Sequence, residues 1–308
     1  MRTSFVNALH KMAKKDDRLY SVIADIGIFM FDEFEKEFPG RFINVGIAEQ
    51  NQIGVCAGLA LNGKIPYAYS IAPFVTLRCL EQIRIDLCYQ KLNVKIIGGG
   101  GGLAYGILGP THHLIEDYAI MRSLPNMAVL APSDPDTTEK AVIAARDWEG
   151  PVYIRISKDK EKKIYTAAEP YKIGKALIPR EGKDAAIIST GTMLVQALDA
   201  AELLAKKGIQ ARVIDMHTIK PLDDEAVLKA AEETRAIVTV EEHNVIGGLG
   251  GAVAELLIES RIRKIPMKRI GIDDFFCTCD GSHEFLKDRC GLHPEKIAET
   301  VEALLSQK

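Results

Sequence analysis

The chain has 308 residues, of which 47% are hydrophobic and 26% charged, which is ordinary globular composition with room for about two domains. A formal net charge of −3 gives no sign of a nucleic-acid or anionic-membrane partner, and no apolar run approaches the roughly 18 residues that cross a bilayer. The polar N-terminus lacks the apolar core of a secretory signal and the six cysteines form no CxxC pair, so we expect a cytoplasmic protein with reduced thiols and no metal site of its own.

Short apolar runs alternate with longer amphipathic stretches through the first half of the chain. Strands are predicted at Leu19–Ala24, Ile65–Tyr69, Val94–Ile97, Ala128–Leu130 and Val152–Ile156. Helices are predicted at Gln50–Leu61, Phe74–Lys91 and Asp136–Trp148. Asp134 and Pro135 precede the last helix and predict its cap and first turn.

The alternation stops at the charged stretch Lys158–Lys163, which predicts a solvated loop, and resumes after Gly182. Strands are then predicted at Ala185–Ser189, Arg212–Met216, Ala236–Glu241 and Lys268–Ile272. Helices are predicted at Met193–Lys206, Gly248–Glu259 and Glu295–Leu305.

Strands that alternate with helices predict an α/β fold whose mostly parallel sheets are flanked by helices. We expect two such domains, at residues 1–165 and 183–308, joined by a linker at 166–182. In open parallel sheets, ligands bind beyond the carboxyl ends of the strands. The residues that follow the predicted strands are therefore the candidate site.

The segment Arg41–Leu61, RFINVGIAEQNQIGVCAGLAL, places Glu49 at the start of an apolar helix, where a carboxylate also favours the helix dipole. The segment closely resembles the GIAEQ or GIxEH signature of the pyrimidine-binding domain of transketolases and 1-deoxyxylulose-5-phosphate synthases. The resemblance implies that Glu49 is catalytic and contacts N1′ of the aminopyrimidine ring of thiamin diphosphate. A carboxylate there stabilises the form of the ring whose 4′-nitrogen removes the C2 proton.

Two further segments resemble the cofactor-lining parts of that domain. The sequence ADIG after the first strand implies that Asp25 and Ile26 lie at the cofactor. The sequence SIAPF resembles the family's TFxxF stretch, which implies that Phe74 stacks on the pyrimidine. Ile71 replaces the first aromatic residue of that stretch, where it can form an apolar wall but cannot stack.

The sequence PTHH at 110–113 resembles the family's G-x-T-H-Q loop, whose histidine faces the substrate. His112 is therefore expected to polarise the substrate or to transfer a proton near the reacting carbon. Arg155 and Lys158 lie near a basic position that binds an anionic substrate tail in this family, with Lys158 the better match, and Arg2 matches another such position.

The loop 98–110, GGGGGLAYGILGP, departs from the family pattern. Gly100 stands where a substrate-facing histidine is usual, and Ile107 and Leu108 stand where Glu-Asp is usual. The glycine run predicts a flexible loop whose backbone approaches a ligand closely. The missing polar groups predict altered recognition of sugar hydroxyls, with Gly100 at the substrate.

The second half contains RVIDMHTIKPL and VEEHNVIGGLGG, which resemble runs of the transketolase C-terminal domain. In this context His243 is expected to be a structural or interface residue. The chain lacks the GDG motif and later Asn with which the family binds Mg²⁺ and the diphosphate. Since Arg2 resembles the start of the pyrimidine-binding domain itself, the resemblance implies the C-terminal subunit of a split transketolase.

Such a subunit would share thiamin diphosphate with an N-terminal partner chain that carries the GDG motif and holds Mg²⁺, and it would associate into a dimer. It would transfer a two-carbon ketol unit from a ketose to an aldose, on sugar or sugar-phosphate substrates. Two other interpretations are a β-subunit of a 2-oxo acid dehydrogenase or decarboxylating synthase, and a non-catalytic scaffold. GIAEQ and VEEHxxxGGLG favour transketolase over the former, and Glu49, Phe74 and His112 together argue against the latter.

Overall fold

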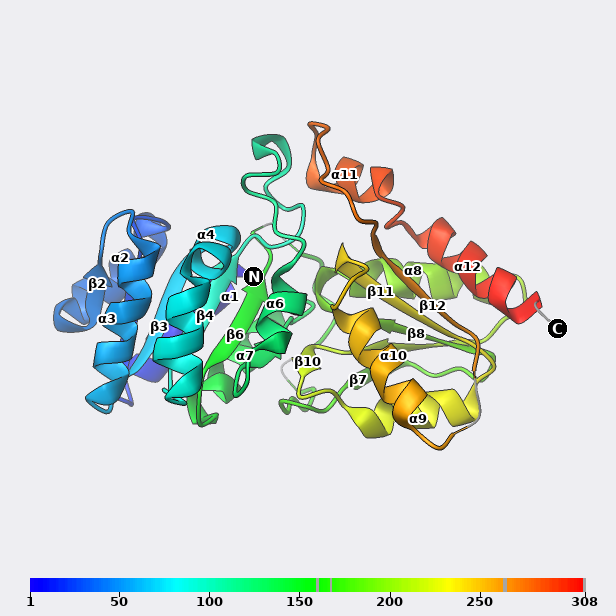
Figure 1. Cartoon of the computed structure of the whole chain (residues 1–308), viewed down its shortest axis with the longest axis horizontal. Coiled ribbons are helices and arrows are strands. Elements are labelled where there is room, and N and C mark those ends of the chain that lie inside the picture. The colour runs from blue at the N-terminus through cyan, green and yellow to red at the C-terminus, as the bar shows by residue number, and fades with distance from the viewer. Residues whose placement is uncertain (159–160, 167, 263–264, 307–308) are drawn as a thin grey trace.

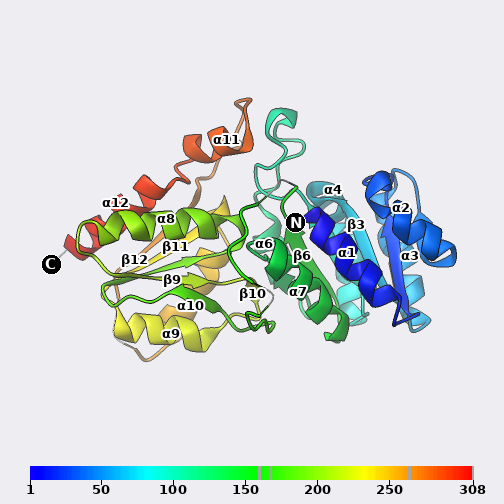
Figure 2. The same ribbon diagram turned by 180° about the vertical axis from the view of Figure 1, so that it is seen from behind.

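The computed structural model describes residues 1–158, 161–166, 168–262 and 265–306 and contains two α/β units that lie side by side (Figures 1 and 2). This confirms the predicted fold class of two mostly parallel sheets flanked by helices. Asp159 and Lys160, from the charged stretch predicted as a loop, lie outside the described residues. Among the described residues, no helix has both the length and the apolar character needed to span a bilayer.

The N-terminal unit is built on a seven-stranded sheet with the order β10-β5-β6-β4-β3-β1-β2. Its strands are β1 (Leu19–Ile23), β2 (Phe42–Asn44), β3 (Ile65–Ile71), β4 (Lys95–Gly99), β5 (Ala128–Leu130), β6 (Val152–Ile156) and β10 (Thr218–Lys220). All neighbours are parallel except β10, which runs antiparallel to β5. The central strands β4 and β6 are buried on both faces, which explains why, apart from Lys95 and Arg155, they appear in the sequence as largely apolar runs.

Helices cover both faces of this sheet. On one face lie α1 (Arg2–Ala13), α2 (Ile28–Glu37) and α7 (Pro135–Asp147). On the other lie α3 (Glu49–Leu61), α4 (Ala72–Thr76), α5 (Leu80–Gln82), the π-helix η3 (Ile83–Tyr89) and α6 (Asp117–Ser123). Short 3₁₀ turns occur at η1 (Pro39–Arg41), η2 (Leu77–Cys79) and η4 (Gly106–Leu108).

The polar N-terminus, for which no helix was predicted, forms α1 because its apolar residues share one face. Phe5 of α1 is fully buried and stacks on Tyr69 of β3, with ring centroids 5.6 Å apart. Phe31 of α2 packs on the same tyrosine at 5.7 Å. Each buried aromatic ring contributes about 1.5–3 kcal/mol, enough to hold a helix with a weak sequence signal.

The helix predicted at Phe74–Lys91 is instead broken into α4, η2, α5 and η3. The hydroxyl of Thr76 donates to the carbonyl of Ala72 at 2.6 Å, and such bonds back to the preceding turn bend helices. The predicted cap of α7 is present, since the Asp134 side chain accepts from the Thr137 amide at 2.8 Å.

The C-terminal unit has a five-stranded sheet with the order β12-β11-β8-β9-β7. Its strands are β7 (Leu177–Arg180), β8 (Ala185–Ser189), β9 (Ala211–Asp215), β11 (Ile237–Asn244) and β12 (Met267–Ile272). The 3₁₀ turn η5 (Gly191–Met193), α8 (Leu194–Ala205), α11 (His283–Arg289) and α12 (Pro294–Ser306) contribute to one core. The second core, on the other face, lies under α9 (Asp224–Glu233) and α10 (Leu249–Glu259).

The stretch 166–182, predicted as a linker, contains β7, which pairs antiparallel with β9. In addition, β10 comes from the second half of the sequence but completes the edge of the N-terminal sheet. The second half of the chain therefore contributes an edge strand to the sheet of the N-terminal unit. The domain limits 1–165 and 183–308 stay a prediction.

Candidate active site

The candidate residues follow the carboxyl ends of parallel strands, on the side of the N-terminal sheet where these strands end. The strand register aligns Ile23 with Asn44, Ile71 with Gly99 and Gly99 with Ile156, so these strands end at the same level. The residues after them are thereby brought together at that edge, as expected for a ligand site in such a sheet. They are Asp25 after β1, Glu49 after β2, Phe74 after β3, Gly100 after β4 and Lys158 after β6.

Glu49 is the first residue of α3, and only 2% of it is exposed. Its Oε2 accepts from Nη1 of Arg78 at 2.6 Å, whereas its Oε1 lies at the longer distance of 3.4 Å from the Ser70 hydroxyl. A buried carboxylate needs such a partner. The Arg78 guanidinium also lies 4.6 Å from the ring centroid of Phe74. Glu49, Arg78 and Phe74 therefore form one cluster, which we call the cofactor cluster.

Sequence reasoning did not single out Arg78 and missed its contact with Glu49. It also missed Asn44, which joins two loops of the site. The Asn44 Oδ1 accepts from the amides of Asp25 and Gly46, both at 3.0 Å, and its amide donates to the Asp25 carboxylate at 3.3 Å. Asp25 has a φ of 52°, a conformation that such local bonds support. Asn44 thereby ties the loop after β1 to the loop that leads to Glu49.

His112 lies within a row of rings and charges that runs from the cofactor cluster to Lys158. Its ring centroid is 5.2 Å from that of Phe74, edge to face, and 5.8 Å from that of Tyr105. The Lys158 ammonium lies 4.7 Å from the Tyr105 ring centroid on the far side. Thr111 and Nδ1 of His112 are hydrogen-bonded at 3.0 Å. Burial lowers the pKa of His112, and neighbouring His113 lowers it further, so the imidazole is neutral at pH 7.

The other residues predicted for the site, Arg2, Ile26 and Ile71, lie outside the row from Glu49 to Lys158. Arg2, at the start of α1, interacts with the hydroxyl of Tyr69, where it partly offsets the rise that burial causes in the pKa of that tyrosine. Ile26 packs against the core beneath α1 and α2. Ile71 is half-buried at the end of β3, directly before α4. The structure thus joins Glu49, Phe74, His112 and Lys158 by contacts and leaves Arg2 with Tyr69.

Two family models match nearly the whole chain. Residues 1–162 match the transketolase pyrimidine binding domain, and residues 174–297 match the transketolase C-terminal domain. The chain belongs to the transketolase family.

Two relatives that match nearly the whole chain are named as parts of divided transketolases. The chain is 40% identical to the 6-deoxy-6-sulfo-D-fructose transketolase subunit SqwH of Clostridium sp. (strain MSTE9), over 100% of this chain and 95% of the relative. It is 42% identical to a subunit of the apulose-4-phosphate transketolase of Phocaeicola vulgatus, over 97% and 96%. Among solved structures, a split gene transketolase, in an inactive beta4 tetramer, superposes with a TM-score of 0.92 at 40% identity and covers 100% of this chain and 98% of its own.

Membership of the transketolase family implies the use of thiamin diphosphate. The cofactor cluster fits the pyrimidine half of that group. Glu49 offers a buried carboxylate oxygen that lies 3.4 Å from the Ser70 hydroxyl, and Phe74 offers a half-buried ring beside it. Within the described part of the chain, no group of three or more His, Cys, Asp or Glu side chains is arranged to hold a metal ion.

The glycine run that departs from the transketolase pattern is packed against protein side chains. A Cβ on Gly98 would lie 2.7 Å from the Tyr153 hydroxyl, and one on Gly99 would lie 3.0 Å from the Tyr69 ring. At Gly100, φ is 74° and a Cβ would collide with Tyr105. The run was interpreted as a flexible loop that approaches a ligand. These positions approach protein side chains closely, whereas a close approach of their backbone to a ligand stays a prediction.

The packing at Gly100 concerns the position where the family pattern has a histidine. The Tyr105 ring takes the space that a side chain at Gly100 would need, and it contacts both His112 and Lys158. Ile107 and Leu108 lie on η4 at the tip of the loop, with 73% and 48% of their surfaces exposed. Tyr105 is thus a site residue that sequence reasoning did not single out, although it lies inside the loop that differs from the family.

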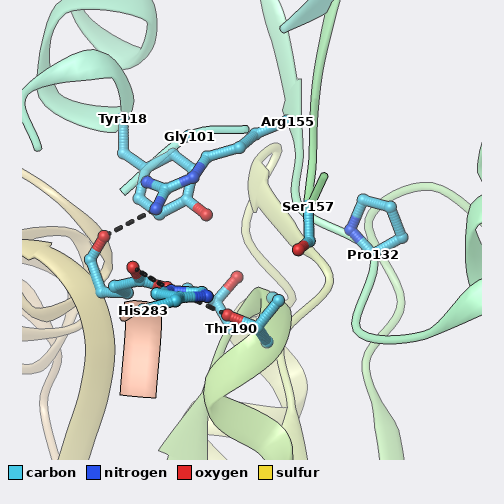
Figure 3. Close-up of a pocket in the computed structure, with 10 residues that line it drawn as sticks. Gly101, Tyr118, Pro132, Arg155, Ser157, Thr190 and His283 are labelled. Atoms are coloured by element: carbon cyan, nitrogen blue, oxygen red, sulfur yellow. Dashed lines mark hydrogen bonds and ion pairs between the residues drawn. The ribbon is translucent and has the colours of Figure 1, made fainter. Parts of the chain in front are cut away.

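A polar cavity of about 10 Å³ lies behind this loop, where the two units meet (Figure 3). Gly101 and Arg155 line it from the N-terminal unit, and Thr190, Glu242 and His283 line it from the C-terminal unit. That volume holds about one water molecule, so this cavity is not a substrate site. His243, expected to be structural, also lies at this junction and stacks on Tyr118 with centroids 5.1 Å apart.

Proposed function

We propose that this chain is the C-terminal subunit of a thiamin diphosphate-dependent transketolase, which transfers a two-carbon ketol unit from a ketose to an aldose. The observation that carries the proposal is the buried Glu49 at the start of α3, in contact through Arg78 with Phe74 and the row that leads to His112. The transketolase models matched by both halves of the chain favour ketol transfer over the chemistry of 2-oxo acid dehydrogenases.

When bound, thiamin diphosphate supplies the nucleophilic carbon and the electron sink for cleaving a bond next to a carbonyl. Glu49 holds or releases a proton at N1′ of the aminopyrimidine, and Arg78 keeps its carboxylate in place. The Phe74 ring offers a face for stacking. Neutral His112 polarises the substrate oxygen or accepts its proton. Asp25 and Ile26, after β1, and Ile71, before α4, complete the cofactor wall.

The diphosphate and Mg²⁺ are proposed to be bound by a separate N-terminal subunit that carries a GDG motif. Relatives that match nearly this whole chain are named as subunits, which supports a divided enzyme. We also propose that the assembly contains two copies of this chain and that it works in the cytoplasm, without nucleic-acid or membrane partners.

The proposed donor is a ketose with an anionic tail. Lys158 lies beside Tyr105 at the end of the row, and Arg2 lies at the same edge of the sheet. The relatives named above act, by their names, on a sulfonated and a phosphorylated sugar. Because Gly100, Ile107 and Leu108 replace polar residues of the family pattern, the hydroxyl pattern of this donor is expected to differ from that of xylulose 5-phosphate.

The proposal is tested by reconstitution. The purified chain is mixed with a candidate N-terminal subunit, thiamin diphosphate and Mg²⁺, and is given a panel of phosphorylated and sulfonated ketoses with an aldose acceptor. Product sugars two carbons longer than the acceptor are expected only when both chains are present, with xylulose 5-phosphate a poor donor. Decarboxylation of 2-oxo acids in place of ketol transfer would contradict the proposal, and a complex with no turnover on any donor would favour a scaffold.

A further inference from the structure

The loop that carries Tyr105 and His112 is anchored by a carboxylate from the other unit. Glu242, on β11, is 4% exposed, and its Oε1 accepts from the backbone amide of Leu103 at 2.6 Å. The same oxygen is 2.7 Å from Nε2 of His283, and Oε2 accepts from the Thr192 hydroxyl at 3.1 Å. Both carboxylate oxygens of Glu242 are thus hydrogen-bonded, and one of these bonds comes from Leu103 at the start of the loop.

Arg155 of β6 reinforces this anchor. Its guanidinium donates to the backbone carbonyl of Glu242 at 2.8 Å and to the carboxylate of Asp117 at 3.1 Å (Figure 3 shows its position above His283). A Cβ on Gly102 would collide with Arg155 and Glu242 together. Burial alone would raise the pKa of Glu242, but His283 and Arg155 hold it well below its usual range, so the carboxylate is ionised.

A second contact holds the tip of the loop. In both views, η4 lies beside the segment that precedes α11 (Figures 1 and 2). A Cβ on Gly106 would lie 2.5 Å from the carbonyl oxygen of Gly281, two residues before His283. The carbonyl of Gly106 is also hydrogen-bonded to Nε2 of His113 at 2.9 Å. The loop is therefore fixed at its start by Glu242 and at its tip by the neighbours of His283.

We infer that Glu242 is a positioning residue, through which the C-terminal unit fixes the loop 100–112 and thereby orients Tyr105 and His112 toward the substrate. That this loop faces the substrate rests on the proposed function. A displacement of about 1 Å in a catalytic geometry costs on the order of 100-fold in rate, so an anchor this direct has a measurable effect. Among the described residues, Glu242 is hydrogen-bonded to Leu103, Arg155, Thr192 and His283, which belong neither to the cofactor cluster nor to the row that contains His112.

The neighbouring residue provides a matched control. Glu241 points to the opposite face of β11, as successive residues of a strand do. It is equally buried, and its carboxylate accepts from the amides of Leu249 and Gly250 at 2.7 and 2.8 Å, where α10 begins. Replacing Glu241 thus damages the C-terminal unit without touching the loop.

The test compares Glu242→Gln with Glu241→Gln in the reconstituted two-chain complex. Three quantities are measured: amide hydrogen exchange of residues 103–112, exchange of the thiamin diphosphate C2 proton, and kcat/KM with the best donor of the ketose panel. For Glu242→Gln we expect loop amides to exchange about 10-fold faster and kcat/KM to fall about 10-fold or more, with C2 exchange within about twofold of wild type. Glu241→Gln should leave loop exchange unchanged.

The inference is overturned if loop exchange in Glu242→Gln equals that of wild type, or if Glu241→Gln loosens the loop equally. If Glu242→Gln does not fold, Thr192→Val removes the bond to Oε2 and should produce a smaller change in the same direction; unchanged loop exchange there also overturns the inference. Failure of the proposed function is distinct, because it appears as absent C2 exchange in the wild-type complex.

Discussion

The two sides of the site are held in different ways. The cofactor cluster, Glu49, Arg78 and Phe74, is built within the N-terminal unit from residues that follow β2 and β3, the two strands on either side of β1. The proposed substrate side is a loop whose start is bonded to Glu242 of the C-terminal unit, over a sequence separation of 139 residues. From this difference we expect that changes on the proposed substrate side, such as Gly100, leave the geometry of the cofactor cluster intact.

The comparison also separates two uses of glycine. In the loop, glycines 98–102 each face a packed side chain, so their small size is needed for close packing. Elsewhere, as at Gly63 after α3, φ is 76° but no atom lies within 4 Å of the position that a Cβ would take, so only the backbone conformation favours glycine.

The largest effect is expected on the cofactor side. Glu49→Gln keeps the shape of the side chain but removes the carboxylate, so exchange of the C2 proton in the two-chain complex should slow by about 100-fold or more. The measurement is deuterium exchange at C2, followed by NMR after quenching. The control is Glu149→Gln, an exposed residue before β6, at the opposite edge of the sheet. Wild-type exchange in Glu49→Gln would remove the proposed role of this residue.

A smaller effect, on the substrate side, is expected from Gly102→Ala. The new Cβ collides with Arg155 and Glu242 at a φ of 65°, which should lower the free energy of unfolding by about 2–3 kcal/mol. Gly63→Ala, at a similar φ but without neighbours, should cost only about 1 kcal/mol. Denaturant unfolding of the two variants measures the difference. Equal losses would show that packing at Gly102 is not what requires glycine.

The smallest effect concerns the pH dependence of turnover. Burial and His113 both disfavour protonation of His112, so a reaction that needs its neutral form should lose rate only as pH falls below the ordinary histidine pKa of about 6.5. His113→Gln removes the imidazole that lowers the pKa of His112 but keeps a donor for the Gly106 carbonyl. The pKa of His112 should then rise, which shifts the acidic limb of the profile upward by less than about one unit.

The control for this profile is His112→Asn, in which the same acidic limb should be missing. An acidic limb that stays in place or moves downward in His113→Gln would contradict the electrostatic coupling of the two histidines.

Sequence patterns predicted the fold class and the long strands, because buried parallel strands appear as continuous apolar runs. They did not predict β7 and β10, since strands of three or four residues at sheet edges carry little periodic signal. They also missed that β10 crosses from one unit to the sheet of the other. These features depend on tertiary packing between distant segments.

The same distinction holds for the site. The position of Glu49 after β2 and of Phe74 after β3 could be predicted from local motifs. The anchor from Glu242 could not, because it joins segments that no local pattern connects. Two adjacent glutamates at the end of a predicted strand, Glu241 and Glu242, were nevertheless a usable signal, since buried carboxylates need partners. Five consecutive glycines after a buried strand were a second signal, of close packing rather than of flexibility.

The measurement that tests the account most directly is C2 proton exchange of thiamin diphosphate with three samples: this chain alone, the N-terminal subunit alone, and the two mixed with Mg²⁺. Because Glu49 lies on this chain and the diphosphate site is proposed to lie on the other, rapid exchange is expected only in the mixture. Rapid exchange with either chain alone would contradict a cofactor site divided between two subunits.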